Sequence, residues 1–564
     1  MKFSRKEVLV FVAILALFLA VRLPAVHRSY HQDEYKWPII VNPALTEPGG
    51  IPHPPVGEFI YKIAGQTVGY DNFRFAPLLF SCLNLLLLFY LVKNIANTTS
   101  AFIGIFLFTI SFYSVLASLM VDTDGAIMPF FFLLSAISYY KLRISNFQID
   151  KTKWKWLLLF VISVIFGFLV KLSFLVGVAA LVFDFALEKN IFADRRKVLK
   201  YFGIGAASTI GLVALLFASK FIFPYFQLES SIKYWEHFWN SSSFFDRGWL
   251  QTFIQFFKSI LYTSPLLFLP VFFVDKEIWS KTRPLFLFIF IGLFFYLFAF
   301  DFSIGALDRY FQFLVVPLCV ISGIIAAKLF EDKNVKFGRR NIIMIFAVAI
   351  LIFGLQLLSH FVPPLHPKAE WVARVISLKW NFLYPFTGGS GPLGFYVSFL
   401  FMAAAWILSV IFIASGLLKS RLRKIALLAT VFIGLVYNGV FVEEYLFGKI
   451  NGSAPQLLAG AAAFIRDNSE IKKVTVYNDN GGYEIQKTGK YRKRLYVDPA
   501  FGVDAKIATL NEFKEHYLEI NIPRIDPNSF YRKYFDSCII AYKQTDRSIS
   551  ATVYDCRNAP DLKP

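Results

Sequence analysis

Charged residues are scarce in this chain of 564 residues. Asp, Glu, Lys and Arg make up 17% of it, whereas hydrophobic residues make up 56%. Soluble domains are typically about 25% charged, so the composition excludes an ordinary soluble protein. The sequence also lacks a P-loop, a paired CxxC motif and an HExxH motif. These absences argue against a cytosolic nucleotide conjugate as the substrate.

Long hydrophobic runs are what the chain has instead. They span roughly 17 to 22 residues, and a helix of about 20 residues crosses the hydrocarbon core of a membrane. We therefore predict a polytopic α-helical membrane protein with about thirteen transmembrane helices. The expected limits are 8–24, 76–92, 100–120, 125–140, 156–170, 172–187, 201–223, 253–274, 285–300, 310–327, 342–361, 396–418 and 425–441. The first run lacks a clear cleavage site, which favours a retained helix over a signal peptide.

Lysine and arginine collect in every second segment between these runs, and such segments face the cytoplasm. The basic segments are 2–6, 141–155, 189–200, 276–283, 328–340 and 419–424. This pattern predicts an integral plasma membrane protein whose N-terminus is cytoplasmic. The formal charge of +20 then reflects membrane topology and gives no reason to expect nucleic-acid binding.

The composition changes after residue 441. Residues 442–564 mix charges of both signs, contain turn signals such as "NDNGGY", and have no hydrophobic run of span length. We predict that 1–441 form the membrane module and that 442–564 form a small α/β or α+β domain on the extracytoplasmic side. Cys538 and Cys556 lie in this domain, where they could form a disulfide or remain two buried thiols.

The first expected outer loop, 25–75, carries several ionisable side chains. Asp33 and Glu34 follow closely on the first span, and His53 precedes two prolines that stiffen the turn. Arg74 stands at the entrance of the second span. Taken alone, the acidic pair is an ordinary solvated pair, and Arg74 could either reach lipid phosphates or clamp a bound phosphate.

Further ionisable residues occur at expected membrane edges. Placing such side chains near the apolar core costs free energy, so their presence there usually indicates a function. Asp122 and Asp124 belong to "VDTDG", Lys171 interrupts an apolar stretch, and Arg309 and Tyr310 begin "RYFQFLVVP". Carboxylates and cations on one face suit the transfer of a group away from a lipid phosphate. One carboxylate would take the proton of the acceptor, while the cations would stabilise the leaving phosphate.

These motifs, in this order, resemble the GT-C glycosyltransferases that use polyprenyl-phosphate sugars. The resemblance rests on "DE" at 33–34, "HPPVGEF", "FRFAPLLF", "DTDG", "FLVK" and "DRYFQFLVVP", and it covers most of 20–320. It is greatest to the superfamily of protein O-mannosyltransferases and lipid A aminoarabinose transferases. It implies a GT-C fold and a hexosyl- or pentosyltransferase that acts by inversion. The donor would be a polyprenyl-phosphate sugar, and the acceptor a lipid, a glycan or a protein at the extracytoplasmic face.

The resemblance also implies roles for individual residues. The expected catalytic residues are Asp33 as general base, with Glu34 and Asp124 in support. The expected ligands of the donor phosphate are His53, Arg74, Lys171 and Arg309, and the expected residues of the acceptor side are Asp122 and Tyr310.

Two alternatives remain open at this stage. No cofactor is indicated, but Asp33, Glu34, His53 and Asp122 are suitable ligands for a divalent metal, although their spacing specifies no site. The chain could also be a lipid or solute transporter or flippase that uses Asp122, Asp124 and Lys171 along a substrate pathway. The lack of a repeated half and the gathering of charge at one face weigh against a transporter.

Overall fold

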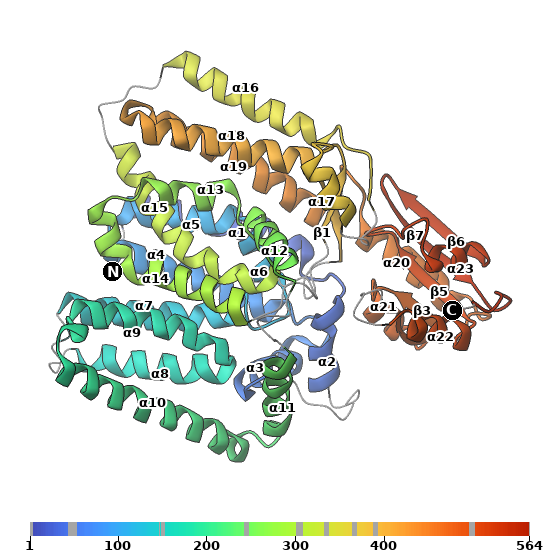
Figure 1. Cartoon of the computed structure of the whole chain (residues 1–564), viewed down its shortest axis with the longest axis horizontal. Coiled ribbons are helices and arrows are strands. Elements are labelled where there is room, and N and C mark those ends of the chain that lie inside the picture. Colours follow the sequence, from blue (N-terminus) through green and yellow to red (C-terminus); the bar gives the residue numbers. More distant parts are fainter. Residues whose placement is uncertain are drawn as a thin grey trace.

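The computed structural model describes residues 4–42, 53–145, 147, 153–241, 248–299, 308–331, 338–363, 369–386, 393–495 and 502–562. A large helical module makes up most of the molecule, and a smaller domain that contains a sheet lies beyond one end of it (Figure 1). The short helices α2 (Lys36–Val41) and α3 (Pro55–Val68), which follow the first predicted span, lie at this same end, next to the smaller domain.

The longer and apolar helices of the module are α1 (Arg5–Ala20), α4 (Phe75–Ile95), α5 (Thr98–Ile110), α6 (Phe112–Leu119), α7 (Ile127–Ile144), α8 (Trp154–Val170), α9 (Leu175–Glu188), α10 (Arg195–Ile222), α12 (Trp249–Thr263), α13 (Pro265–Phe268), α14 (Lys276–Ala299), α15 (Val315–Glu331), α16 (Arg339–Gln356), α18 (Phe399–Leu418) and α19 (Arg423–Leu446). Shorter elements join them: η1 (Leu23–Ala25), η2 (Gln32–Tyr35), α2 (Lys36–Val41), α3 (Pro55–Val68), η3 (Leu172–Phe174), η4 (Ile191–Ala193), α11 (Leu228–Ser241), η5 (Leu269–Phe273), η6 (Asp308–Leu314), α17 (Ala369–Ile376), η7 (Ser420–Leu422) and the antiparallel pair β1 (Leu383–Phe386) and β2 (Phe395–Ser398).

Every predicted hydrophobic run contains a helix, although thirteen exceeds the number of helices that have the full length of a span in the described residues. Among the described residues, nine helices are long and apolar enough to cross a membrane, and two bent pairs raise this number to eleven. The excess comes from 156–170 and 172–187, because α8 has 17 residues and α9 has 14. The backbone is extended at Lys171, which separates these two helices.

Helices α5 and α6 form one of the bent pairs, with an angle of 67° between them. A bend in a transmembrane helix leaves backbone carbonyl groups at the break without their helical hydrogen-bond partners. The buried side chain of Arg22 compensates for this loss: it donates to the carbonyl oxygens of Phe108 and Thr109 in α5 and to the hydroxyls of Ser114 and Ser118 in α6. The bend directs the chain from α6 into the loop that carries Asp122 and Asp124.

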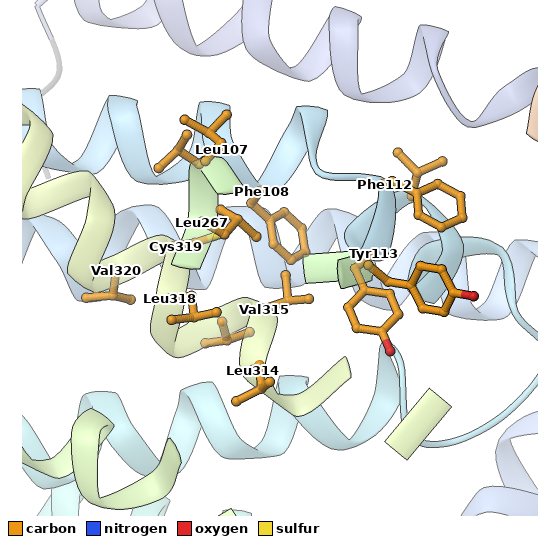
Figure 2. Packing of buried hydrophobic residues seen from close by; sticks show 14 of the residues in the cluster. Leu107, Phe108, Phe112, Tyr113, Leu267, Leu314, Val315, Leu318, Cys319 and Val320 are labelled. Carbon is orange, nitrogen blue, oxygen red and sulfur yellow. The ribbon is translucent and has the colours of Figure 1, made fainter. Parts of the chain in front are cut away.

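The core of the module is centred on α15, which packs closely against α5. A Cβ atom on Gly323 of α15 would lie 2.8 Å from the Cα atom of Gly104 in α5, so this crossing requires a residue without a side chain. Next to it, Phe108 of α5 lies beside Val315 of α15 in the same cluster of buried residues, as Figure 2 shows. The N-terminal end of this well-packed helix is joined to η6, which presents Arg309 and Tyr310.

The C-terminal domain contains a five-stranded sheet of order β4–β3–β5–β7–β6. Strand β3 (Val474–Tyr477) is parallel to β4 (Tyr491–Leu495) and β5 (His516–Ile520), whereas β7 (Ile549–Asp555) is antiparallel to β5 and to β6 (Ile539–Asp546). The helices of the domain are α20 (Ala454–Asp467), α21 (Gly482–Lys487), α22 (Val503–Glu512) and α23 (Phe530–Asp536). The mixed sheet with helices fits the predicted α/β or α+β class. Cys538 and Cys556 form a disulfide, one of the two states that the sequence left open.

Candidate active site

The turn η2 carries the acidic pair Asp33 and Glu34. Glu34 is buried and accepts two hydrogen bonds from Arg74, at 2.6 and 2.7 Å. It also accepts from the backbone N–H groups of His31 and Val121, each at 3.0 Å. Glu34 therefore ties η2 to α4 and to the loop that follows α6.

Arg74 was predicted to bind the donor phosphate, but its bonds indicate another role. Besides Glu34, its guanidinium donates to the carbonyl oxygens of Arg28, Ser29 and Leu119. All five N–H donors of this buried side chain are thus committed to protein oxygens. The geometry favours a role for Glu34 and Arg74 in holding the loop.

Asp33 lies on the other side of η2 and faces η6. Its side chain is 34% exposed, and one carboxylate oxygen lies 3.2 Å from Nη1 of Arg309. The same nitrogen lies 3.3 Å from a carboxylate oxygen of Asp122, whose side chain is only 7% exposed. Lys36 forms an ion pair with Asp33 from the exposed side. Arg309 thus joins two carboxylates that are far apart in the sequence.

A second ion pair lies beside the first. Nζ of Lys171 is 2.5 Å from a carboxylate oxygen of Asp124, and both groups are buried. Both cations lie over the ring of Tyr310, with Lys171 at 5.0 Å and Arg309 at 4.9 Å from its centroid. Nη2 of Arg309 also donates to the hydroxyl of Tyr310 at 3.1 Å. Asp33, Asp122, Asp124, Lys171, Arg309 and Tyr310 are called the charge cluster below.

The loop between α6 and α7 is held in place by close packing and by hydrogen bonds. A Cβ atom on Gly125 would lie 2.8 Å from the backbone of Ala117, which explains the glycine of "DTDG". The hydroxyl of Tyr61 in α3 donates to the carbonyl oxygen of Asp122 at 2.9 Å. His53, immediately before α3, is near enough to lower the pKa of Asp122.

Electrostatics favours the charged forms of Asp122 and Lys171, whereas burial raises the pKa of Asp124 above its ordinary value even beside Lys171. Burial raises the pKa of Asp122, but Arg309, Lys171 and His53 lower it by more, so that it lies below its ordinary value. Burial lowers the pKa of Lys171, but Asp124, Tyr310 and Asp122 raise it by more, so that it lies above its ordinary value. At neutral pH the cluster therefore combines fixed positive charge with an accessible carboxylate, Asp33.

The residues of this region do not gather around a point that suits a metal ion. Across the described part of the chain, no group of three or more His, Cys, Asp or Glu side chains is arranged to hold one. Asp33 and Asp122 both face the cationic Arg309, and Glu34 is bonded to Arg74. The proposed metal ligands thus do not fit a shared site in this arrangement.

Three residues that make contacts around the site were not predicted from the sequence. Tyr61 lies in the expected loop, but nothing in its surroundings indicated a bond to the "DTDG" backbone. Asp479 and Asn480 of the C-terminal domain contact Tyr35 and His31 on either side of Asp33. The only available signal was the turn sequence "NDNGGY", which predicted a turn but not its partner.

Comparisons with known proteins identify the fold of the chain. The family model for dolichyl-phosphate-mannose-protein mannosyltransferases matches residues 52–220, which include His53, Asp122, Asp124 and Lys171. The crystal structure of ArnT from Cupriavidus metallidurans bound to undecaprenyl phosphate is similar over 99% of both chains, with a TM-score of 0.52 and 14% identity. Its apo state gives a TM-score of 0.51 and 12% identity over 98% of both chains. The chain has the GT-C fold. A search of curated protein sequences finds no match.

The GT-C fold confirms the fold class predicted from the motifs. It also agrees with the apolar helices in identifying an integral membrane protein. The five charged members of the charge cluster come from three separate motifs of the resemblance and from the "DE" pair, and the fold brings them together at one end of the module.

Proposed function

We propose that this protein is an inverting glycosyltransferase that moves a sugar from a polyprenyl-phosphate donor to an acceptor at the extracytoplasmic face. The observation that carries the proposal is the position of Asp33. Its side chain is 34% exposed and lies 3.2 Å from Arg309, whereas Asp122 and Asp124 are buried at 7% and 3%. An accessible carboxylate next to fixed cations suits a base beside a phosphate site.

The proposed reaction is a single displacement. Asp33 accepts the proton of an acceptor hydroxyl while the acceptor oxygen forms a bond to the anomeric carbon. The bond between that carbon and the phosphate oxygen breaks, and its electron pair leaves with the polyprenyl phosphate. Because the attack comes from the face opposite to the leaving group, the anomeric configuration inverts. Arg309 and Lys171 stabilise the negative charge of the leaving phosphate.

Binding of the donor would also change the partners of Asp33. Arg309 forms ion pairs with both Asp33 and Asp122. A phosphate that enters the charge cluster offers oxygens of similar geometry to the same N–H groups. We infer that it displaces Asp33 from Arg309, which frees the carboxylate to accept a proton when the donor is in place.

The remaining residues have supporting roles in this proposal. Asp124 fixes the position of Lys171, Asp122 that of Arg309, and His53 adds positive potential near Asp122. Glu34 and Arg74 hold η2 instead of contacting the donor. The cations of the cluster supply charge stabilisation, so no step of the proposal passes through a metal.

The comparisons support the class of donor. The matching family model describes enzymes named for dolichyl-phosphate mannose, and the similar ArnT structure is bound to undecaprenyl phosphate. A lipid, a glycan or a protein could serve as acceptor, and the sugar is a hexose or a pentose. We further propose that the N-terminus is cytoplasmic, since basic residues collect in the segments on its side. The members of the charge cluster lie between the longer helices or in short 3-10 turns and not within a long helix, which argues against the transporter alternative.

The test combines a lipid comparison with one substitution. Mass spectrometry of cells with and without the gene should show a polyprenyl-phosphate sugar that accumulates in its absence. With that donor, Asp33→Asn should lower the transfer rate by about 10²- to 10⁴-fold, because it removes the base, while the variant still binds donor.

Asp71→Asn is the matched control, since Asp71 lies in the same loop with 66% of its side chain exposed and is outside the charge cluster. It should transfer at the rate of the unmodified protein. Unchanged transfer by Asp33→Asn, or no accumulated donor, would overturn the proposal.

A further inference from the structure

The C-terminal domain reaches η2 through a single turn. Between β3 and α21, residues 478–481 approach the first outer loop. Nε2 of His31 lies 3.2 Å from Oδ1 of Asn480, and the hydroxyl of Tyr35 donates to a carboxylate oxygen of Asp479 at 3.0 Å. His31 and Tyr35 lie two residues on either side of Asp33, so the turn contacts both ends of the segment that carries it.

Bonds within the C-terminal domain orient the two side chains that make these contacts. Nδ2 of Asn480 donates to the carbonyl oxygens of Ile520 and Ile522, at 3.3 and 3.1 Å. This leaves Oδ1 to face His31, so the imidazole donates from Nε2. Asp479 also forms an ion pair with Arg494 at 3.1 Å. Its buried carboxylate is therefore held in place before it receives the Tyr35 hydroxyl.

The backbone of the turn has an unusual conformation. Asn478 and Asp479 have positive φ angles of 53° and 58°, and Gly481 has a φ of 94°. A Cβ atom on Gly481 would lie 2.3 Å from the side chain of Leu458 in α20. Left-handed conformations at successive non-glycine residues cost free energy and often accompany a function. Here they direct Asp479 and Asn480 toward η2.

We propose that the C-terminal domain is a working part of the active site, in which Asp479 and Asn480 hold η2 at both ends and so set the position of Asp33. On the opposite side, Glu34 is fixed to the membrane module by Arg74. The segment that carries the base is thus held by both the membrane module and the C-terminal domain. The inference rests on the proposed glycosyltransferase function, and it makes Asp479, Asn480, His31 and Tyr35 positioning residues.

A second contact of the same domain provides the matched control. The hydroxyl of Tyr483 donates to Asp71 at 2.6 Å, and the Tyr483 ring lies 4.8 Å from that of Tyr30. The Tyr483 hydroxyl docks the domain on the first loop and does not bond η2. The Tyr483 ring does stack on Tyr35, at 6.4 Å between centroids, but Tyr483→Phe keeps this ring contact. Tyr35→Phe and Tyr483→Phe each remove one hydroxyl that donates to an aspartate across the same interface.

The experiment measures steady-state transfer by the full-length protein with the donor lipid. Tyr35→Phe and Asp479→Ala should each lower kcat by about tenfold to a hundredfold, since a small misplacement of a reacting group is costly. The KM for the donor should remain within about twofold in both, because the donor cations lie in the membrane module. Asp479→Asn should recover part of the loss, as its amide oxygen can still accept from Tyr35. Tyr483→Phe should keep the kcat of the unmodified protein.

The effects of Tyr35→Phe and Asp479→Ala should also fail to add in the double variant, because both remove the same bond. Equal losses of kcat in Tyr35→Phe and Tyr483→Phe would show simple docking and overturn the inference, as would an unchanged kcat in Tyr35→Phe and Asp479→Ala. Absence of transfer by the unmodified protein would instead overturn the proposed function. The two failures are therefore distinguishable.

Discussion

Arg309 is the residue on which the charge cluster depends most. Its guanidinium lies within 3.3 Å of two carboxylates and is bonded to the hydroxyl of Tyr310. The planar fork of arginine can bind two oxygens of a phosphate at once, whereas lysine offers a single charged centre. A change to lysine therefore keeps the charge and removes the geometry.

We expect Arg309→Lys to weaken binding of polyprenyl phosphate by about tenfold to a hundredfold, in line with the loss of one hydrogen bond between charged groups. Lys36→Met is the control, because Lys36 also pairs with Asp33 but is 50% exposed. It should change binding by less than about threefold. Thermal shift of the purified protein against polyprenyl phosphate measures both. Equal affinities of Arg309→Lys and the unmodified protein would argue against the phosphate site.

Among the elements, α3 connects the first loop to the "DTDG" loop. Its Gly57 is close to Thr123, and Tyr61 bonds the Asp122 backbone. The same helix carries Glu58, which is 8% exposed. Burial raises the pKa of Glu58 to about 7, and Lys62 lowers it only in part. The ordinary value is 4.5, so the folded protein binds this proton more tightly than the unfolded chain.

The free energy of unfolding should accordingly fall as the pH rises from about 4.5 to 7, because the folded state must then give up a proton or bury a charge. At 1.36 kcal/mol for each pKa unit, Glu58 alone accounts for up to about 3 kcal/mol. Glu58→Gln should remove this part of the dependence. Thermal unfolding at pH 5 and pH 8 measures it, and parallel losses in both proteins would contradict the assignment to Glu58.

The elements also show what the sequence could and could not predict. Hydrophobic runs located the helices. The motifs identified a set of neighbouring residues, because ionisable side chains at a membrane edge cost free energy and are kept there for a reason; the set is Asp33, Asp122, Asp124, Lys171 and Arg309. Arg74 also lies at a membrane edge. Whether its N–H groups bond protein or ligand depends on carbonyl groups elsewhere in the chain, such as that of Leu119, which the local sequence does not reveal. The pairing of Tyr35 with Asp479, 444 residues apart, leaves no local pattern at all.

At the scale of the whole molecule, the disulfide between Cys538 and Cys556 stabilises the C-terminal domain, which contacts η2. It joins the start of β6 to the end of β7 across 18 residues. Closing a loop of this length contributes about 3 kcal/mol by restricting the unfolded chain.

We expect the double variant Cys538→Ser, Cys556→Ser to lose about that much stability in the C-terminal domain. Limited proteolysis should then cut this domain more rapidly while the membrane module stays intact. Cys82→Ser is the control, as Cys82 lies in α4 and is not bridged. Identical proteolysis of the two variants would show that the bridge contributes little.

The contact between His31 and Asn480 joins parts of the chain that are 449 residues apart. During synthesis the first loop emerges long before the turn that holds it. At about 5 to 20 residues per second, the ribosome needs roughly 20 to 90 seconds to make the intervening chain. Throughout that interval the nascent protein already has its acidic pair at the membrane surface but lacks the turn that sets the position of Asp33. On the inference above, transfer would reach its full rate only after the C-terminal domain has folded onto the first loop.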